Sequence, residues 1–192
     1  MFSDAIVAIA ITLLVLPLAE AASQIGDRSA VELLRDERSE ILAFLLSFAV
    51  IAQLWLTQHR VLSPVVRASG ALTAVLLLWT LTIVALPFPT ALVAEAGEDT
   101  GTKVLYVGVL TVSSALLTSM AWIVKADPSL RDPAAPLSTV SGVGGAAMTA
   151  SLLVALVVMV AWPASSYLPL LLLLLVEPSL RWVRRRSLRR RG

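Results

Sequence analysis

Hydrophobic residues along this chain fall into six long runs that are separated by short polar segments. A run of about 17–25 apolar residues is long enough to cross a bilayer as an α-helix. Strands of outer-membrane barrels alternate apolar and polar side chains, whereas Leu170 to Val176 is an unbroken apolar stretch. The pattern therefore predicts an all-α integral membrane bundle of six transmembrane helices, at residues 4–19, 41–59, 71–94, 104–124, 138–162 and 167–183.

Composition agrees with lipid as the solvent for most of the chain. Of its 192 residues, 58% are hydrophobic and only 15% are charged, and the mean hydropathy is +0.87. A soluble domain of this length would need more charged surface to stay in water. We therefore expect a multi-pass membrane protein.

Basic residues are distributed unequally between the two sides of the predicted membrane topology. One side carries 4 of them, namely Arg28, Arg35, Arg38 and Lys103. The other side carries 11, namely Arg60, Arg67, Lys125, Arg131, Arg181, Arg184, Arg185, Arg186, Arg189, Arg190 and Arg191. Since Lys and Arg near the spans favour the cytoplasmic side, both termini are expected in the cytoplasm of a protein of the plasma membrane.

Acidic residues gather on the side with few basic ones. They are Glu20, Asp27, Glu32, Asp36, Glu37, Glu40, Glu95, Glu98 and Asp99. This side of the protein is therefore predicted to be an acidic outer face.

The final segment, RWVRRRSLRRRG, could bind either nucleic acid or lipid headgroups. A basic run directly after a span more often anchors the topology at anionic lipids. We therefore expect a six-span transmembrane domain at 1–183 and a basic cytoplasmic tail at 184–192 that contacts anionic lipids and no nucleic acid.

Side chains that could carry catalysis or hold a metal ion are scarce. The chain has 1 His, no Cys and no clustered carboxylates within the predicted spans, so no partnered nucleophile or metal-ligand set is recognisable. We expect no enzyme, no catalytic residues, no cofactor and no bound metal. A channel, a non-conducting multispan scaffold and a small-solute transporter remain open, although broken helices around a midplane ion site, typical of transporters, are not evident.

The first run begins with a polar pair, Ser3 and Asp4, either of which can cap a helix. Downstream, Ile9, Leu13 and Leu16 recur at spacings of four and three, so they form one stripe of a helix with Thr12 beside it. Packing inside the same bundle is the commoner role of such a stripe, and lining a pore is the alternative.

The stretch FSDAIVAIAITLLVLPL resembles the first span of the transmembrane protein 175 family of potassium channels in its bacterial single-repeat form. Its FSD motif is Phe2, Ser3 and Asp4. The segments at 44–62 and 76–95 resemble the second and third spans, including their Trp, His and PFPT signatures. The family usually has an Arg four residues before the Phe; either the start is truncated here, or the α-amino group at residue 1 partly replaces that charge.

This resemblance implies a potassium-permeable cation channel, a homotetramer in which the first span of each subunit lines the pore. It implies a hydrophobic constriction at Ile9, further apolar layers at Leu13 and Leu16, and pore-lining hydroxyls at Thr12. A single helix about 10–12 Å across cannot enclose a conduit, so several copies must surround an axis. The permeant ion would be potassium.

The second predicted span carries the only histidine of the chain, His59, four residues after Trp55. A histidine there could sense pH, bind Ser3 or Asp4, or simply lie at the membrane interface. The resemblance favours a structural network that joins His59 and Trp55 to the motif.

Overall fold

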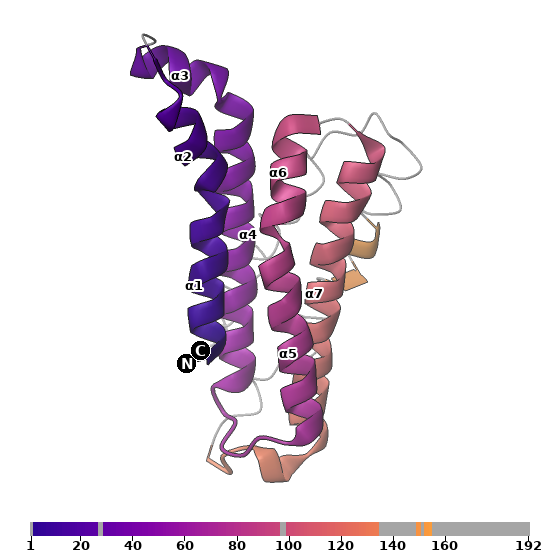
Figure 1. The fold of residues 1–192 in the computed structure, drawn as a ribbon. Coiled ribbons are helices and arrows are strands. Elements are labelled where there is room, and N and C mark those ends of the chain that lie inside the picture. The colour runs from indigo at the N-terminus through magenta and orange to yellow at the C-terminus, as the bar shows by residue number, and fades with distance from the viewer. Residues whose placement is uncertain (1, 27–28, 97–98, 135–148, 151, 155–192) are drawn as a thin grey trace, which may run out of the picture.

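The computed structural model describes residues 2–26, 29–96, 99–134, 149–150 and 152–154, and the elements within these ranges are helices (Figure 1). Four spans in the described part are long and apolar enough to cross a membrane: Phe2–Ser23, Arg38–Leu62, Gly70–Glu95 and Thr100–Ala126. The first four predicted spans are thereby confirmed. The predicted spans at 138–162 and 167–183 lie outside the described residues, apart from 149–150 and 152–154, and so does the basic tail at 184–192.

The first span consists of two helices, α1 (Phe2–Leu14) and α2 (Leu16–Ser23), rather than one. Pro17 has no amide hydrogen, so the carbonyl of Leu13 loses the donor that a continuous helix would supply. Val15 lies between the two helices, and its N–H donates to the carbonyl of Thr12 at 3.3 Å. The pore-forming candidate therefore has a break near its middle.

A short helix, α3 (Ala30–Asp36), leads into the second span, α4 (Arg38–Leu62). Ser29 and Glu32 form a reciprocal capping box at its start, in which the Ser29 N–H donates to the Glu32 carboxylate at 2.8 Å. No residue of α3 is buried. This helix lies beyond the end of the first span in Figure 1.

The third span is also divided, into α5 (Gly70–Ala85) and α6 (Pro87–Ala96). Pro87 and Pro89 cannot donate to the carbonyls one turn before them, which ends the regular ladder of hydrogen bonds. The hydroxyl of Thr90 donates to the carbonyl of Leu86 at 2.8 Å and thus stabilises the break.

The fourth span, α7 (Thr100–Ala126), packs against α4, α5 and α6 and is followed by a 3-10 turn, η1 (Pro128–Leu130). Asp99 caps α7 by accepting from the N–H of Thr102 at 2.8 Å. The core against α7 includes the fully buried side chains of Trp79 and Ile83. Lys103, expected in the preceding connection, lies instead in the first turn of α7 and is buried.

Three buried hydroxyl groups join α4, α6 and α7. The Ser47 hydroxyl lies 2.8 Å from that of Thr90 and 3.1 Å from that of Tyr106. Hydrogen bonds between helices hold membrane bundles together where water cannot compete. This cluster therefore fixes how the broken third span packs.

Replacing Ser47 with Ala should lower the free energy of unfolding by about 0.6–2 kcal/mol, since it removes both interhelical bonds. Thermal unfolding in detergent would measure the change. Ser119→Ala is the matched control, because the Ser119 hydroxyl is exposed and bonds only the carbonyl of Ala115 in its own helix. Equal losses in both variants would contradict a role for the Ser47 bonds.

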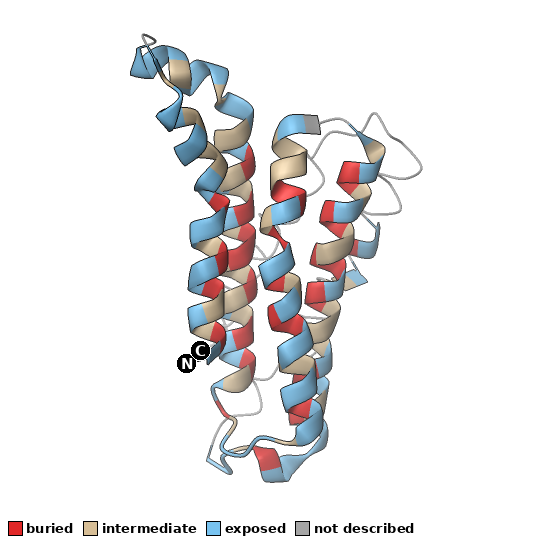
Figure 2. Ribbon diagram, viewed as in Figure 1, coloured by how far each residue is buried: buried red, intermediate tan, exposed pale blue. Residues whose placement is uncertain are grey.

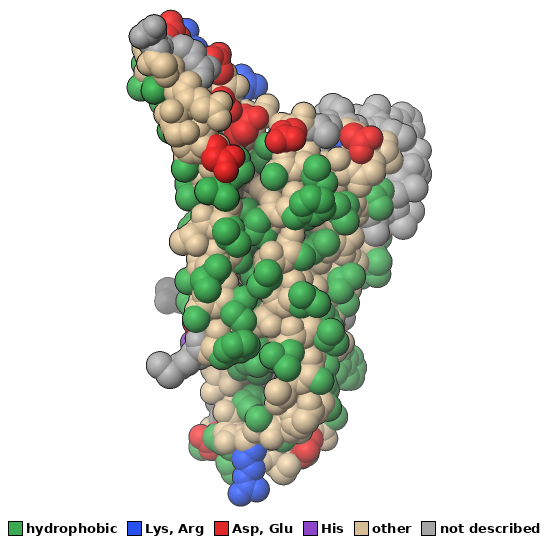
Figure 3. Space-filling model, viewed as in Figure 1, with side chains coloured by type: hydrophobic (Ala, Val, Ile, Leu, Met, Phe, Trp, Pro, Cys, Tyr) green, Lys and Arg blue, Asp and Glu red, His purple; other side chains and the backbone are tan. Residues whose placement is uncertain are grey.

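Acidic side chains predominate at one end of the bundle, and both signs of charge occur at each end (Figure 3). The acidic end comprises the end of α2, the helix α3 and the end of α6. It carries Glu20, Glu32, Asp36, Glu37, Glu40, Glu95 and Asp99. The basic end, where α4 and α7 terminate, carries Arg60, Arg67, Lys125 and Arg131 together with Asp127 and Asp132. The Asp99 carboxylate stays charged over a wide pH range, because the backbone N–H of Thr102 holds the pKa of Asp99 below its ordinary value.

Candidate functional site

One face of α1 is buried inside the protomer and packs against α4, α5 and α6 (Figure 2). Its buried residues recur at spacings of three and four, namely Ser3, Val7, Ala10 and Leu14. The spacing matches one side of an α-helix. This face attaches α1 to the rest of its own subunit.

The opposite face carries Ile9, Thr12, Leu13 and, beyond the break, Leu16; we call these four residues the α1 outer face. The side chains of Ile9, Leu13 and Leu16 are 59%, 43% and 50% exposed. Packing among the described helices of one protomer therefore does not explain the stripe. Aliphatic side chains in such a row need cover from lipid or from other subunits.

The first span is also the least buried of the four. Only 17% of its hydrophobic stretch is buried within the protomer, compared with 50% for α7. A helix in the centre of a single bundle would be covered on all sides. The first span therefore lies at the edge of the described part of the bundle.

The hydroxyl of Thr12 donates to the carbonyl of Ile9 at 2.7 Å. Its proton is thus used within the helix, while the oxygen lone pairs remain available to accept from water or to approach a cation. Thr12 is exposed on the protomer. It is the polar member of an otherwise aliphatic face.

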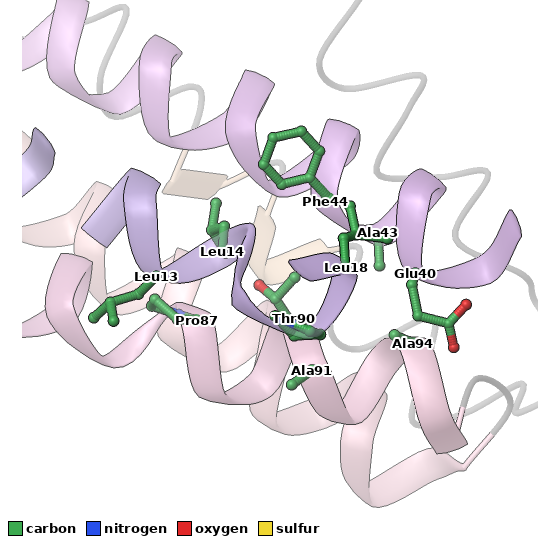
Figure 4. Close-up of a pocket in the computed structure, with 11 residues that line it drawn as sticks. Leu13, Leu14, Leu18, Glu40, Ala43, Phe44, Pro87, Thr90, Ala91 and Ala94 are labelled. Atoms are coloured by element: carbon green, nitrogen blue, oxygen red, sulfur yellow. The ribbon is translucent and has the colours of Figure 1, made fainter. Parts of the chain in front are cut away.

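A small cavity of about 20 Å³ lies behind the α1 outer face, where the two broken spans meet (Figure 4). Leu14 and Pro17 approach it from the first span, Pro87 and Thr90 from α6, and Glu40 from α4. A cavity of this size holds about one water molecule. The two proline breaks therefore face each other across a space with little room for a ligand.

The motif residues are joined to α4 by two hydrogen bonds. The indole N–H of Trp55 donates to the carboxylate of Asp4 at 2.9 Å, and the side-chain amide of Gln58 donates to the hydroxyl of Ser3 at 3.4 Å. The ring of His59 lies 5.7 Å from that of Trp55, centroid to centroid. His59 is exposed and thus joins this group through its contact with Trp55.

Phe2, the remaining motif residue, is 64% exposed and belongs to no described hydrogen-bonded network. Gln58 was not identified from the sequence, although it follows Trp55 by three residues and so lies on the same side of α4. A buried amide in an apolar span is the signal that could have revealed it, because such a group needs a partner.

No group of three or more His, Cys, Asp or Glu side chains within the described ranges is arranged to hold a metal ion. The site thus consists of an aliphatic face with one hydroxyl, anchored at its beginning by a polar contact to α4. It can form a surface between subunits or around a pore.

Residues 1–87 match the family model described as "Endosomal/lysosomal potassium channel TMEM175". The chain is 32% identical over 136 residues to a potassium channel from Streptomyces collinus, which covers 69% of this chain and 66% of that relative. It is 41% identical over 95 residues to a potassium channel from Chamaesiphon minutus, and this alignment covers 49% of this chain and 47% of that relative. The aligned part thus spans about two-thirds and about half of these relatives' lengths.

The fold resembles the crystal structure of a lysosomal potassium-selective channel TMEM175 homolog from Chamaesiphon minutus. The TM-score is 0.72 with 26% sequence identity, and the match covers 94% of each chain. The likeness therefore extends across nearly the whole fold, beyond the first three spans that carry the sequence signatures.

Proposed function

Because this chain belongs to the TMEM175 family of potassium channels, we propose that it forms a potassium-permeable cation channel whose pore is lined by α1 of each subunit. It is a multi-pass membrane protein, and its relatives are potassium channels, which are not enzymes. Its constriction would be made by Ile9, with Leu13 and Leu16 as further apolar layers and Thr12 supplying hydroxyls.

The observation that carries this proposal is the exposure of the α1 outer face. Ile9 is 59% exposed, while Ala10, its neighbour on the opposite face, is 1% exposed. Copies of α1 around a common axis can bring such faces together without disturbing the packing of α1 within each subunit. The break at Val15 would let Leu16 meet the axis at a different tilt from Ile9 and Leu13.

A narrow ring of aliphatic side chains controls the passage of ions because water fills it only with difficulty. Such a ring dewets easily, and an ion that passes must shed part of its hydration shell. Potassium holds its hydration water less tightly than sodium does, so the barrier is lower for potassium. The Thr12 oxygens would offset part of the lost hydration one turn away.

The proposed assembly is a homotetramer of six-span subunits with the four α1 helices at its centre. Identical subunits ordinarily close around an axis by cyclic symmetry. In the plasma membrane, the basic end would face the cytoplasm together with both termini, and anionic lipids would meet the tail at 184–192. The acidic end would then form the outer mouth of the pore.

A non-conducting scaffold would have to cover the α1 outer face with lipid or with a different protein. The relatives named above are potassium channels, and this favours conduction over that alternative. Ion flux in reconstituted vesicles separates the two functions directly.

Purified full-length protein in liposomes should carry potassium down its gradient faster than sodium under matched conditions. A fluorescent membrane-potential assay measures both fluxes, and crosslinking of the same vesicles reports the number of subunits. Protein-free liposomes are the control. Absence of flux from a correctly assembled oligomer would refute the channel.

Replacing Glu20 with Gln should lower potassium conductance roughly twofold at low ionic strength, because exposed acids near a pore mouth concentrate cations. The loss should shrink at high salt, where exposed charges are screened. Glu95→Gln is the matched control, since Glu95 is exposed at the same end but lies on α6. Equal effects of both changes would contradict a specific place for Glu20 beside the pore.

A further inference from the structure

An apolar groove of about 220 Å³ lies at the basic end, away from the α1 outer face. It is formed by the end of α4, the connection at 63–69 and the start of α5. Its lining residues are Leu62, Val65, Ala68, Leu72, Thr73 and Leu76. The Thr73 hydroxyl donates to the carbonyl of Ser69 at 3.0 Å, so the wall of the groove is almost entirely aliphatic.

Two arginines lie next to lining residues of this groove along the backbone. Val65, which lines it, forms an isolated antiparallel bridge with Arg131, and the N–H of Val66 donates to the carbonyl of Leu130 at 2.9 Å. Directly paired residues of an antiparallel bridge carry their side chains on the same face. The Arg131 side chain therefore leaves the backbone on the same side as Val65, and Arg67 immediately precedes Ala68 of the groove.

One donor of the Arg131 guanidinium has no partner in the described part of the chain, although the Asp127 carboxylate lies near this side chain. The Nε of Arg131 is buried and has no hydrogen-bond partner in that part of the chain. Two acids lie near it along the chain, and each has one oxygen bonded elsewhere: Asp127 accepts from the N–H and hydroxyl of Ser129, and Asp132 accepts from the N–H of Ala134. A buried donor without an acceptor is costly, so an oxygen acceptor such as that of a phosphate is expected beside the Arg131 Nε.

We propose that the groove binds an acyl chain of a phospholipid with an anionic headgroup, and that Arg67 and Arg131 hold its phosphate. The groove lies at the ends of two hydrophobic spans, which is the depth at which headgroups meet acyl chains. At the basic end Arg60, Arg67, Lys125 and Arg131 outnumber the acids Asp4, Asp127 and Asp132, so its net charge complements an anionic headgroup. This site is separate from the proposed pore and does not depend on conduction.

Native mass spectrometry of the full-length protein in detergent tests the proposal, with phosphatidylglycerol and phosphatidylcholine of identical acyl chains as probes. Phosphatidylglycerol should bind more tightly. Arg67→Gln and Arg131→Gln should each weaken its binding about fivefold while leaving phosphatidylcholine unchanged. Arg35→Gln, at the acidic end, is the matched control and should change neither lipid.

A separate variant tests whether the groove binds the acyl chain. Ala68→Phe adds a ring that fills the groove, so the binding of both lipids should weaken together. Circular dichroism and size-exclusion chromatography of each variant report whether the fold and assembly are retained. Loss of selectivity in the arginine variants and loss of both lipids in Ala68→Phe would support the site.

Three results would overturn the proposed lipid site. Equal affinity for the two lipids in the natural protein would remove the role of the headgroup, and unchanged phosphatidylglycerol binding in the double arginine variant would place the lipid elsewhere. A photoreactive p-benzoylphenylalanine at position 73 gives the third. Its crosslinking to residues 135–192 instead of to lipid would mean that the chain itself fills the groove.

Discussion

Ion flux through vesicles containing the Ile9→Asn variant is expected to exceed that of the natural protein about tenfold. In the proposed assembly, four Ile9 side chains form the ring from which water is expelled. Four amides in their place would hold water in the constriction and lower the barrier, and a barrier lower by about 1.4 kcal/mol corresponds to a tenfold rate. Preference for potassium over sodium should fall in the same variant, because ions could keep more of their hydration shells.

Leu81→Asn provides the control for this experiment. Leu81 lies on α5 and is 63% exposed, close to the 59% of Ile9, so the two changes place the same amide at equally exposed positions of different spans. Flux should respond only at position 9. If Ile9→Asn left potassium flux unaltered in a well-assembled protein, α1 would not form the constriction.

Removal of the Trp55–Asp4 hydrogen bond should have the second large effect. Trp55→Phe leaves the Asp4 carboxylate without the indole donor that lies 2.9 Å away. Hydrogen bonds to charged groups contribute about 1.5–3 kcal/mol, so the free energy of unfolding should fall by about that amount. Flux should fall as well, because this bond ties the start of α1 to α4 and thereby sets the direction of the α1 outer face.

A double-mutant cycle with Asp4→Ala isolates this bond. Thermal unfolding of the two single variants and the double variant should give a coupling energy of about 0.5–3 kcal/mol. Trp122→Phe is the control for loss of an indole, since Trp122 is 56% exposed and contacts Lys125 through its ring face. Additive single changes would mean that the Trp55–Asp4 bond does not stabilise the protein.

Much of the fold was predictable because membrane spans are recognisable within local stretches of sequence. The predicted spans at 41–59 and 104–124 fall inside α4 and α7, which extend only a few residues further at each end. The positions of the helix breaks were not predicted. Pro17 and Pro87 are visible in the sequence, yet a proline can kink a helix or end it, and the surrounding packing decides between the two.

The site was predictable in part through the resemblance to a known family. That resemblance suggested a network of Trp55, His59 and the motif, and in the structure the Trp55 indole donates to Asp4 while Gln58 donates to Ser3. Which neighbour of Trp55 reaches the motif depends on the rotation of α4 against α1. The groove between α4 and α5 had no sequence signal at all, since leucines and valines look alike whether they line a groove or face lipid.

The sequence alone shows that the chain crosses the membrane several times, with most acids on one side and most bases on the other. These properties follow from the length and composition of each run, because each run partitions between lipid and water independently of the other runs. Which side of α1 stays uncovered in the protomer depends on tertiary packing. Val7 and Leu14 are as apolar as Ile9 and Leu13, so periodicity finds two equivalent stripes. Contact with α4, α5 and α6, which come from distant parts of the chain, buries the first pair and leaves the second exposed.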